Sequence, residues 1–160
     1  MNLHSQRDEI LFQGPGAEAA FERARALLFA FGFYAPKVVA ELPKGGLAPG
    51  VLLQQHARVG PLRFAGPVRV FDVWDRASSS GREAGFSYEA LPGHVERGVA
   101  QFALALKADV VSFRIESDSA PAKWFAKLGA PVARVVQRRA VAHAFRNMRA
   151  ATRPRESAGA

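Results

Sequence analysis

The chain has 160 residues, of which 49% are hydrophobic and 22% are charged, and its formal net charge is +8 at pH 7. This composition is typical of a globular domain and excludes an intrinsically disordered chain. Cysteine is absent, which excludes disulfides and thiolate zinc sites. No apolar run approaches the roughly 18 residues that span a bilayer, and the first nine residues lack the apolar core of a signal peptide. We therefore expect a soluble, cytoplasmic protein.

The positive charge is concentrated near the C-terminus. From Arg134 onward the chain has seven arginines and one acidic residue, Glu156, so that six of the eight net positive charges lie in this stretch. Any attraction to anions is therefore expected from the C-terminal segment.

The N-terminal part of the chain predicts a strand followed by a helix. Residues 9–13 form a short strand candidate, which Gly14-Pro-Gly16 closes. Apolar residues then recur at helical spacing from Ala17 to Phe31 and predict a helix that ends near Gly32. Residues 38–42 predict a short extended piece before a loop.

The middle of the chain predicts antiparallel strands joined by turns. In residues 51–59 a more apolar row of side chains alternates with a more polar row. This is typical of a sheet strand with one face turned toward solvent. A polar loop is expected over residues 75–83, and Lys107-Ala-Asp109 has the spacing of a hairpin turn. The other predicted strands are residues 68–74, the stretch around Phe86 and Tyr88, residues 97–106 and residues 110–116.

The C-terminal part predicts helices. A helical segment is expected from Trp124 to Leu128, and Pro131 is well placed as the first residue of a long helix that continues to about Ala151. A helix packed on an antiparallel sheet is an α+β domain, which we expect to occupy residues 1–151. Residues 152–160 are predicted to be a disordered basic tail.

One corner of the predicted sheet carries most of the unusual polar residues. Pro92-Gly93 is a strong turn signal between two strand-like runs, so Tyr88, Glu89, His94 and Glu96 are expected to lie close together. A histidine beside a carboxylate could act as a general base or a proton shuttle. The catalytic candidates are therefore Tyr88, His94 and Glu96.

A purely structural role for this corner is the alternative. In that case His94 hydrogen-bonds its own corner, and Glu96 pairs with Arg97 or Arg82 at the surface. The sequence spacing specifies no nucleophile and no third catalytic partner, so both interpretations stay open.

The long helix predicts two further candidates. At about 100° per residue, His143 and Asn147 share a stripe with Val132 and Val136. If this stripe is buried against the sheet, both polar groups need partners. Those partners are either a ligand in a cavity or groups of the protein. A third alternative is that the site lies near the helix end and is hydrated by solvent.

Two stretches of the sequence are distinctive. One is the corner Leu91-Pro-Gly-His94, and the other runs from Leu128-Gly-Ala-Pro131 to Gln137-Arg-Arg139. With several further matches they resemble a bacterial and plant family, the domain of unknown function nineteen-ninety, over roughly residues 8–150. The further matches are Phe86-Ser-Tyr88, Glu96, Gly98, Phe102, Ser119-Ala-Pro-Ala122 followed by Trp124, and the helix from Phe21 to Leu28 after Gly14-Pro-Gly16.

The chain departs from the family pattern at three places. Glu89-Ala90 stands where Gly-Thr is expected, Val99-Ala100 where an acidic pair is expected, and Ala120 where an arginine is expected. If those residues serve a chemical step in relatives, this chain is a divergent or non-catalytic member.

The resemblance implies the helix-grip superfamily, which includes START lipid carriers, pollen-allergen-like proteins and polyketide cyclases. In that fold a curved antiparallel sheet wraps around a long C-terminal helix and leaves a cavity between them. The resemblance also implies binding of an apolar or amphipathic small molecule in this cavity, and it assigns no residue a catalytic role. The expected lining is Tyr88, His94, Phe102, Phe113, Ile115, Val136, His143 and Asn147.

Two alternative functions remain open. One is an enzyme of the cyclase or hydratase type that uses Tyr88, His94 and Glu96. The other is binding of nucleic acid or anionic lipid by the C-terminal arginines, although no nucleic-acid motif accompanies them. No cofactor or metal is indicated, because the four histidines are scattered and no glycine-rich phosphate loop is present.

Overall fold

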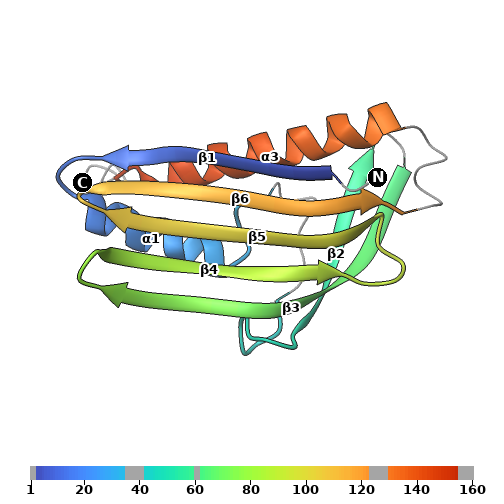
Figure 1. Cartoon of the computed structure of the whole chain (residues 1–160), viewed down its shortest axis with the longest axis horizontal. Coiled ribbons are helices and arrows are strands. Elements are labelled where there is room, and N and C mark those ends of the chain that lie inside the picture. The colour runs from blue at the N-terminus through green and yellow to red at the C-terminus, as the bar shows by residue number, and fades with distance from the viewer. Residues whose placement is uncertain (1–2, 35–41, 60–61, 123–129, 155–160) are drawn as a thin grey trace, which may run out of the picture.

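The computed structural model describes residues 3–34, 42–59, 62–122 and 130–154 (Figure 1). Most of the predicted extended piece at 38–42 and the predicted helical segment from Trp124 to Leu128 lie outside the described residues. The elements in chain order are β1 (Leu3–Gln13), α1 (Ala17–Phe29), β2 (Leu52–Val59), β3 (Leu62–Ser78), β4 (Gly81–Ala90), β5 (Glu96–Lys107), β6 (Val110–Pro121) and α3 (Ala130–Thr152).

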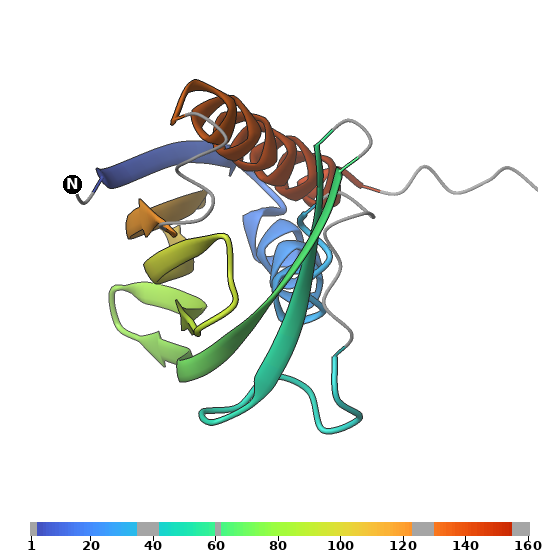
Figure 2. The same ribbon diagram turned by 90° about the vertical axis from the view of Figure 1, so that its right-hand side faces the viewer.

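The six strands form one antiparallel sheet in the order β1-β6-β5-β4-β3-β2. The sheet curls, and both helices lie on its concave side, as Figures 1 and 2 show. α3 runs beside β1, and α1 packs against α3 and the middle strands. This arrangement confirms the predicted α+β class and the helix-grip fold. No helix among the described residues is long and apolar enough to cross a bilayer.

Strand alternation produces the concave face. Successive side chains of a strand point to opposite faces, so Phe102, Leu104 and Leu106 of β5 are buried while Gln101 and Lys107 are exposed. α1 meets this face with a row of small and apolar side chains, which lets the helix approach the sheet closely. The buried residues of α1 are Ala17, Ala20, Phe21, Ala24 and Leu28.

An aromatic core fills the concave face. Phe31 and Phe33, from the turn after α1, pack on the sheet. The ring centroids of Phe33 and Phe102 are 4.9 Å apart, those of Phe31 and Phe86 are 5.4 Å apart, and those of Phe33 and Phe113 are 6.1 Å apart. All five rings are almost completely buried. Each large buried aromatic side chain stabilises the fold by several kcal/mol, on the order of 3–5 by truncation to alanine.

The end of α1 aims Phe31 into this core. The N–H of Phe31 donates to Leu28 O and that of Gly32 to Leu27 O, both at 3.0 Å. These two bonds form a Schellman motif, whose left-handed position usually holds glycine. Here Phe31 occupies it, with φ of 56°, at a cost of roughly 1–2 kcal/mol. The burial of the Phe31 ring offsets this strain. The observed helix therefore ends at Phe29, before the predicted end near Gly32.

Polar contacts hold the C-terminal end of α3. Arg23 of α1 donates to the carbonyl oxygens of Ala151 and Thr152 at 3.2 and 2.7 Å. The Thr152 hydroxyl donates to Leu11 O of β1 at 3.2 Å. A cation at a helix C-terminus is favourable because the last carbonyls carry partial negative charge.

The predicted polar loop over residues 75–83 is wrong. β3 continues to Ser78 and β4 starts at Gly81, so only a tight turn separates them. The strands persist because their polar side chains are paired: Glu83 lies 3.5 Å from Arg76 and 3.4 Å from Lys107. The predicted strand 9–13 is likewise longer and starts at Leu3, and it pairs with β6 along its length.

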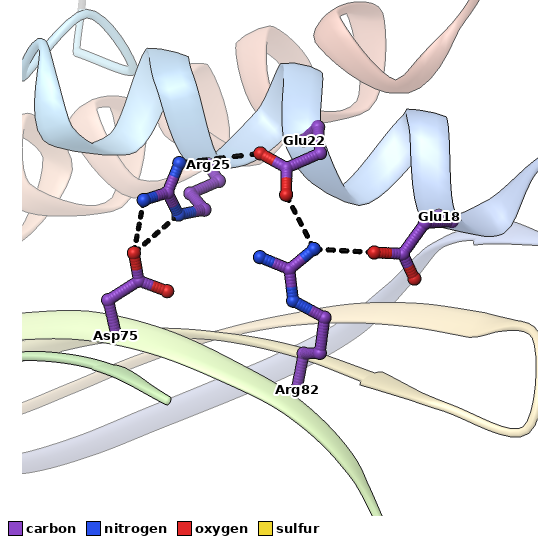
Figure 3. A network of polar contacts seen from close by, with 5 residues as sticks. All are labelled: Glu18, Glu22, Arg25, Asp75 and Arg82. Carbon is purple, nitrogen blue, oxygen red and sulfur yellow. Dashed lines mark hydrogen bonds and ion pairs between the residues drawn. The ribbon is translucent and has the colours of Figure 1, made fainter. Parts of the chain in front are cut away.

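A network of charged side chains joins α1 to β3 and β4 (Figure 3). Arg82 Nη1 of β4 lies 2.5 Å from a carboxylate oxygen of Glu18 and of Glu22. The Arg82 guanidinium also lies 4.7 Å from the ring centroid of Phe21. Arg25 pairs with Asp75 of β3 and, at 3.3 Å, with Glu22.

We expect Arg82→Ala to lower the free energy of unfolding by about 1–2 kcal/mol, because it removes two partly exposed ion pairs and a cation–π contact. Urea denaturation at low and high salt measures this change, and part of it should vanish at high salt. Arg97→Ala is the control, since Arg97 is exposed and makes no ion pair within the described residues. Equal effects of the two substitutions would contradict the role of the network.

Candidate functional site

Polar side chains gather on the concave side of the sheet where β4 ends and the chain turns into β5. Tyr88 points inward from β4, and Gln55 points inward from β2. The corner folds over β3, because Leu91 N–H donates to Pro67 O at 3.0 Å and His94 N–H donates to Leu91 O at 3.1 Å. His94 is thereby placed on the buried side, with only 9% of its surface exposed.

A glycine of β3 makes room for the corner. A Cβ atom on Gly66 would lie 2.6 Å from the Cα of His94 and 2.5 Å from its ring carbon Cδ2. Real Cβ atoms do not come so close to another heavy atom, so any side chain at this position would displace the corner. Gly66 therefore fixes the position of the imidazole.

The ring of His94 has protein partners for both nitrogens. Nδ1 lies 3.0 Å from the backbone nitrogen and 3.1 Å from the carbonyl oxygen of Glu96, and Nε2 lies 3.3 Å from Oε1 of Gln55. Burial lowers the pKa of His94 from its ordinary value of 6.5, and a backbone hydrogen bond to Glu96 opposes this only in part. The imidazole is therefore neutral at pH 7.

Two tyrosines extend this polar group into the aromatic core. Burial raises the pKa of Tyr88 to about 12, although the nearby Gln55 and Tyr34 side chains act in the opposite direction. Burial also raises the pKa of Tyr34, and a hydrogen bond to Tyr88 adds to the increase. Both hydroxyls are therefore protonated at neutral pH and can donate. The Tyr88 ring centroid lies 5.6 Å from that of Phe102 and 6.3 Å from that of Phe31.

Two buried nitrogen atoms lack hydrogen-bond partners within the described part of the chain. They are Nε2 of Gln55 and Nδ1 of His143. The Gln55 amide is close enough to influence the Tyr88 hydroxyl, but its Nε2 makes no hydrogen bond of good geometry. A buried donor without an acceptor destabilises a protein by about 1–3 kcal/mol. Such a group in a native structure calls for an explanation.

The two acidic residues of the corner separate. Glu89 lies on the outer face, where its carboxylate accepts from Arg69 Nε at 2.7 Å, so the prediction that it joins the cluster is wrong. Alternation along β4 explains this, since Tyr88 takes the inner face. Burial raises the pKa of Glu96, and a hydrogen bond from Ser119 opposes the increase. Arg82 pairs with Glu18 and Glu22, so the predicted pairing of Glu96 with Arg82 is also wrong.

His94 contacts the backbone of Glu96 rather than its carboxylate. The histidine–carboxylate pair that general-base chemistry would use is therefore not formed. The alternative interpretation, in which His94 hydrogen-bonds its own corner, agrees with these contacts.

The remaining predicted lining residues take different positions. Phe102, Phe113 and Ile115 are buried on the concave face, while the side chain of Val136 lies outside the described part of the structure. Asn147 Nδ2 donates to Phe33 O at 2.9 Å, which is a structural hydrogen bond. His143 is half-buried, and its Nδ1 is one of the unpaired atoms.

The buried side of α3 differs from the predicted stripe. It consists of Ala144, Phe145 and Met148, and His143 and Asn147 lie on its flank. Neighbouring helix positions differ by about 100°, so the predicted stripe of His143 and Asn147 lies to one side of the residues that face the core. The ring of Phe145 packs against Phe113, with centroids 5.2 Å apart.

Sequence reasoning missed Gln55 and Tyr34. The signal for Gln55 was present, because it occupies the row of Val51, Leu53 and Ala57 in an alternating strand. A polar residue in the apolar row of a strand predicts a buried polar group. Tyr34 had no comparable signal, since it follows the end of a helix.

The described residues contain no group of three or more histidine, aspartate or glutamate side chains that could hold a metal ion. A hollow of about 450 Å³ lies on the outer face of the sheet around Trp74, but its charged residues largely pair with one another, for example Asp8 with Arg114 at 2.8 Å. The inner cluster of Tyr34, Gln55, Tyr88 and His94 is therefore the better candidate, and we call it the inner polar cluster.

Comparisons with known proteins agree with the fold. A family model described as a domain of unknown function (DUF1990) matches residues 2–147. No curated protein matches the chain at a significant level. The Zhui aromatase/cyclase from Streptomyces sp. R1128 is similar in structure, with a TM-score of 0.64, 12% identity and 99% of each chain covered.

Two plant proteins are also similar in structure. Norcoclaurine synthase from Thalictrum flavum, in complex with dopamine and hydroxybenzaldehyde, has a TM-score of 0.54 and 12% identity, with 91% of this chain and 84% of that chain covered. The major latex-like protein 151 from Panax ginseng has a TM-score of 0.51 and 10% identity, with 96% and 99% covered. At these identities the similarity concerns the fold alone.

We expect Gly66→Ala to lower the free energy of unfolding by about 1–3 kcal/mol, because the new methyl group overlaps the backbone of His94. Gly45→Ala is the matched control, since Gly45 is exposed and a Cβ there meets no atom within 4 Å. Urea denaturation of both variants tests the prediction. Equal stability of Gly66→Ala and Gly45→Ala would show that the corner around His94 does not pack closely against Gly66 of β3.

We also expect the burial of His94 to make the protein less stable in acid. Its pKa is lower in the folded chain than the 6.5 of an exposed histidine, so the unfolded chain binds more protons as the pH falls below about 6.5. The free energy of unfolding should then decrease by at most about 1.4 kcal/mol per pH unit from this residue.

The measurement compares the wild-type protein with His94→Gln between pH 7.5 and 5, with the exposed His4→Gln as control. Glu96 acts in the opposite direction, because its raised pKa favours the folded state at low pH, but it is common to all three proteins. The wild-type protein and His4→Gln should lose more stability on acidification than His94→Gln. Parallel curves for all three would refute the assignment.

Proposed function

The chain belongs to the family described as a domain of unknown function (DUF1990), and from this premise we propose that it binds an apolar or amphipathic small molecule through a neutral oxygen atom of that molecule. The observation that carries the proposal is the buried Nε2 of Gln55, which has no hydrogen-bond partner among the described residues. An oxygen acceptor on the ligand would complete the hydrogen bonds of the inner polar cluster.

The surroundings of Gln55 support an apolar ligand. The neighbouring Tyr88 belongs to the aromatic core together with Tyr34 and Phe102, whose ring centroids are 5.9 Å apart. Small-molecule sites are typically lined by apolar and aromatic side chains with a few polar groups that orient the ligand. The aromatic rings would contact the apolar part of the ligand, and the inner polar cluster would orient its oxygen.

The charge state of the cluster supports a neutral oxygen. The buried polar residues among those described are Gln55, Ser87, His94, Ser119 and Thr152, and none is lysine or arginine. His94 is neutral, and Tyr34 and Tyr88 are protonated at pH 7, as their pKa shifts imply. A carboxylate or phosphate placed here would lose its hydration without gaining a counter-charge. A carbonyl or hydroxyl oxygen carries no such penalty.

A protein of the same fold provides independent support. The norcoclaurine synthase structure holds dopamine and hydroxybenzaldehyde, which are small aromatic molecules with neutral oxygen atoms. The helix-grip fold is therefore able to accommodate such compounds. At 12% identity this supports the class of ligand and leaves the identity of the ligand open to experiment.

An enzyme of the cyclase or hydratase type has less support from the contacts. Both ring nitrogens of His94 already have protein partners, and Ser119 hydrogen-bonds to Glu96. A general base needs a free lone pair within reach of the substrate. Tyr88 stays protonated because its pKa is raised, so its hydroxyl can donate a hydrogen bond. In our proposal this hydrogen bond orients the ligand.

Three probes that share a naphthalene ring system test the proposal: 2-acetylnaphthalene, naphthalene and 2-naphthoate. We expect 2-acetylnaphthalene to bind most tightly, because its carbonyl accepts from Gln55. Gln55→Leu should weaken it about tenfold, the equivalent of one net hydrogen bond, and should leave naphthalene within about twofold. Isothermal titration calorimetry or quenching of tryptophan fluorescence measures the three affinities.

Gln54→Leu is the matched control, because Gln54 is the next residue on β2 and points to the exposed face. It should bind all three probes as the wild-type protein does. Tighter binding of 2-naphthoate than of 2-acetylnaphthalene would contradict the neutral-oxygen site. An equal loss of affinity for naphthalene and for 2-acetylnaphthalene in Gln55→Leu would also contradict it, since that pattern indicates damage to the core.

A further inference from the structure

The outer side of α3 carries an unusual concentration of positive charge. α3 has no aspartate or glutamate, and Arg153 follows directly after its end. At about 100° per residue its arginines fall within an arc of about 140°. The buried Phe145 lies near one edge of this arc, and the buried Ala144 and Met148 lie outside it. All five are exposed, and they are Arg134, Arg138, Arg139, Arg146 and Arg149.

Most of these arginines are unpaired. On the rest of the surface, Arg25, Arg69 and Arg114 each pair with a carboxylate. On α3, Arg149 pairs with Glu9 of β1. The other four arginines of α3, and Arg153 after it, make no ion pair within the described part of the chain. Their charges are therefore available to an external partner.

A hollow of about 450 Å³ lies in this basic face, between β1 and α3. Four guanidinium groups and one carboxylate line it, so its net charge is about +3. The side chain of Arg7 is held over the ring of Phe145, 4.8 Å from the centroid, and pairs with Glu9. Its floor includes two alanines, which leave room for a bound group. The lining residues are Arg7, Glu9, Ala142, Phe145, Arg146, Arg149, Ala150 and Arg153.

We propose that this face of α3 docks on an anionic lipid bilayer, with a headgroup phosphate in the hollow between β1 and α3. Guanidinium groups match phosphate oxygens in a two-pronged geometry. From Arg134 to Arg149 the charges extend over about 22 Å of helix at 1.5 Å per residue, so several can contact a flat surface at once. Val135 is 44% exposed between them, and it can enter the headgroup region while the arginines bind phosphates.

Nucleic acid fits the same face less well. Its exposed residues are arginine, alanine and valine, so it offers no asparagine or glutamine to contact base edges and no aromatic ring to stack on bases. Only the phosphate attraction would remain, without the contacts that distinguish a nucleic acid from any other polyanion. Figure 2 shows α3 at the edge of the molecule with β1 beside it.

Vesicle flotation of the full chain tests the proposal. Vesicles of phosphatidylcholine with about 30% phosphatidylglycerol are compared with phosphatidylcholine alone. Each arginine near an anionic surface contributes about a fivefold gain in binding. We therefore expect the double variant R146Q/R153Q to bind anionic vesicles about 25-fold more weakly. Raising the salt to about 0.5 M should also release the wild-type protein, because screening shortens the range of the attraction.

The matched control is the double variant K44Q/R76Q, which removes the same charge from the loop before β2 and from the outer face of β3. It should bind within about threefold of the wild-type protein, and circular dichroism should show all variants folded. Equal loss in both double variants, equal binding to neutral vesicles, or tighter binding to a 20-base-pair DNA duplex than to anionic vesicles would each overturn the proposal. None of these measurements depends on the interior, so their outcome is separate from that of the naphthalene probes.

Discussion

The packing of Phe31 and Phe33 against the inner aromatic row of the sheet is the contact on which the rest of the structure depends. It holds the turn after α1 on the sheet, and α3 is tied to the same turn because Asn147 donates to Phe33 O at 2.9 Å. The left-handed backbone of Phe31 is tolerated because the ring is buried. The inner polar cluster borders this core, since Tyr88 packs on Phe31 and Phe102.

Polar groups in this fold contribute to stability only where they are paired. Arg82 and Arg25 join α1 to β3 and β4 through carboxylates, and Arg23 holds the end of α3. By contrast, the amide nitrogen of Gln55 inside and most arginines of α3 outside have no partner among the described groups. An unpaired buried donor and a row of like charges both oppose folding. Sites of this kind are where a ligand or a surface would lower the free energy, and both proposals arise from them.

Much of the fold could be predicted from the sequence. Alternation identified β2 and the paired strands β5 and β6, and helical periodicity identified α1 and α3. The family resemblance is confirmed by the match over residues 2–147, and with it the helix-grip arrangement. The predicted loop over residues 75–83 was wrong, because several charged partners of those strands come from other elements: Arg25 pairs with Asp75, Glu18 with Arg82 and Lys107 with Glu83. No local pattern reports such partners.

The candidate site divides in the same way. By itself the sequence determined which residues of the corner could act, namely Tyr88 and a turn that carries His94 and Glu96. Gln55, in an apolar row of β2, was visible in the sequence but was not predicted as part of the site. Only the tertiary structure decided which of them meet: it brought Gln55 to His94 across 39 positions of the chain and sent Glu89 to the opposite face. The physical reason is that a strand's period sets the face of each side chain, whereas strand order, the curl of the sheet and the close approach at Gly66 determine its neighbours.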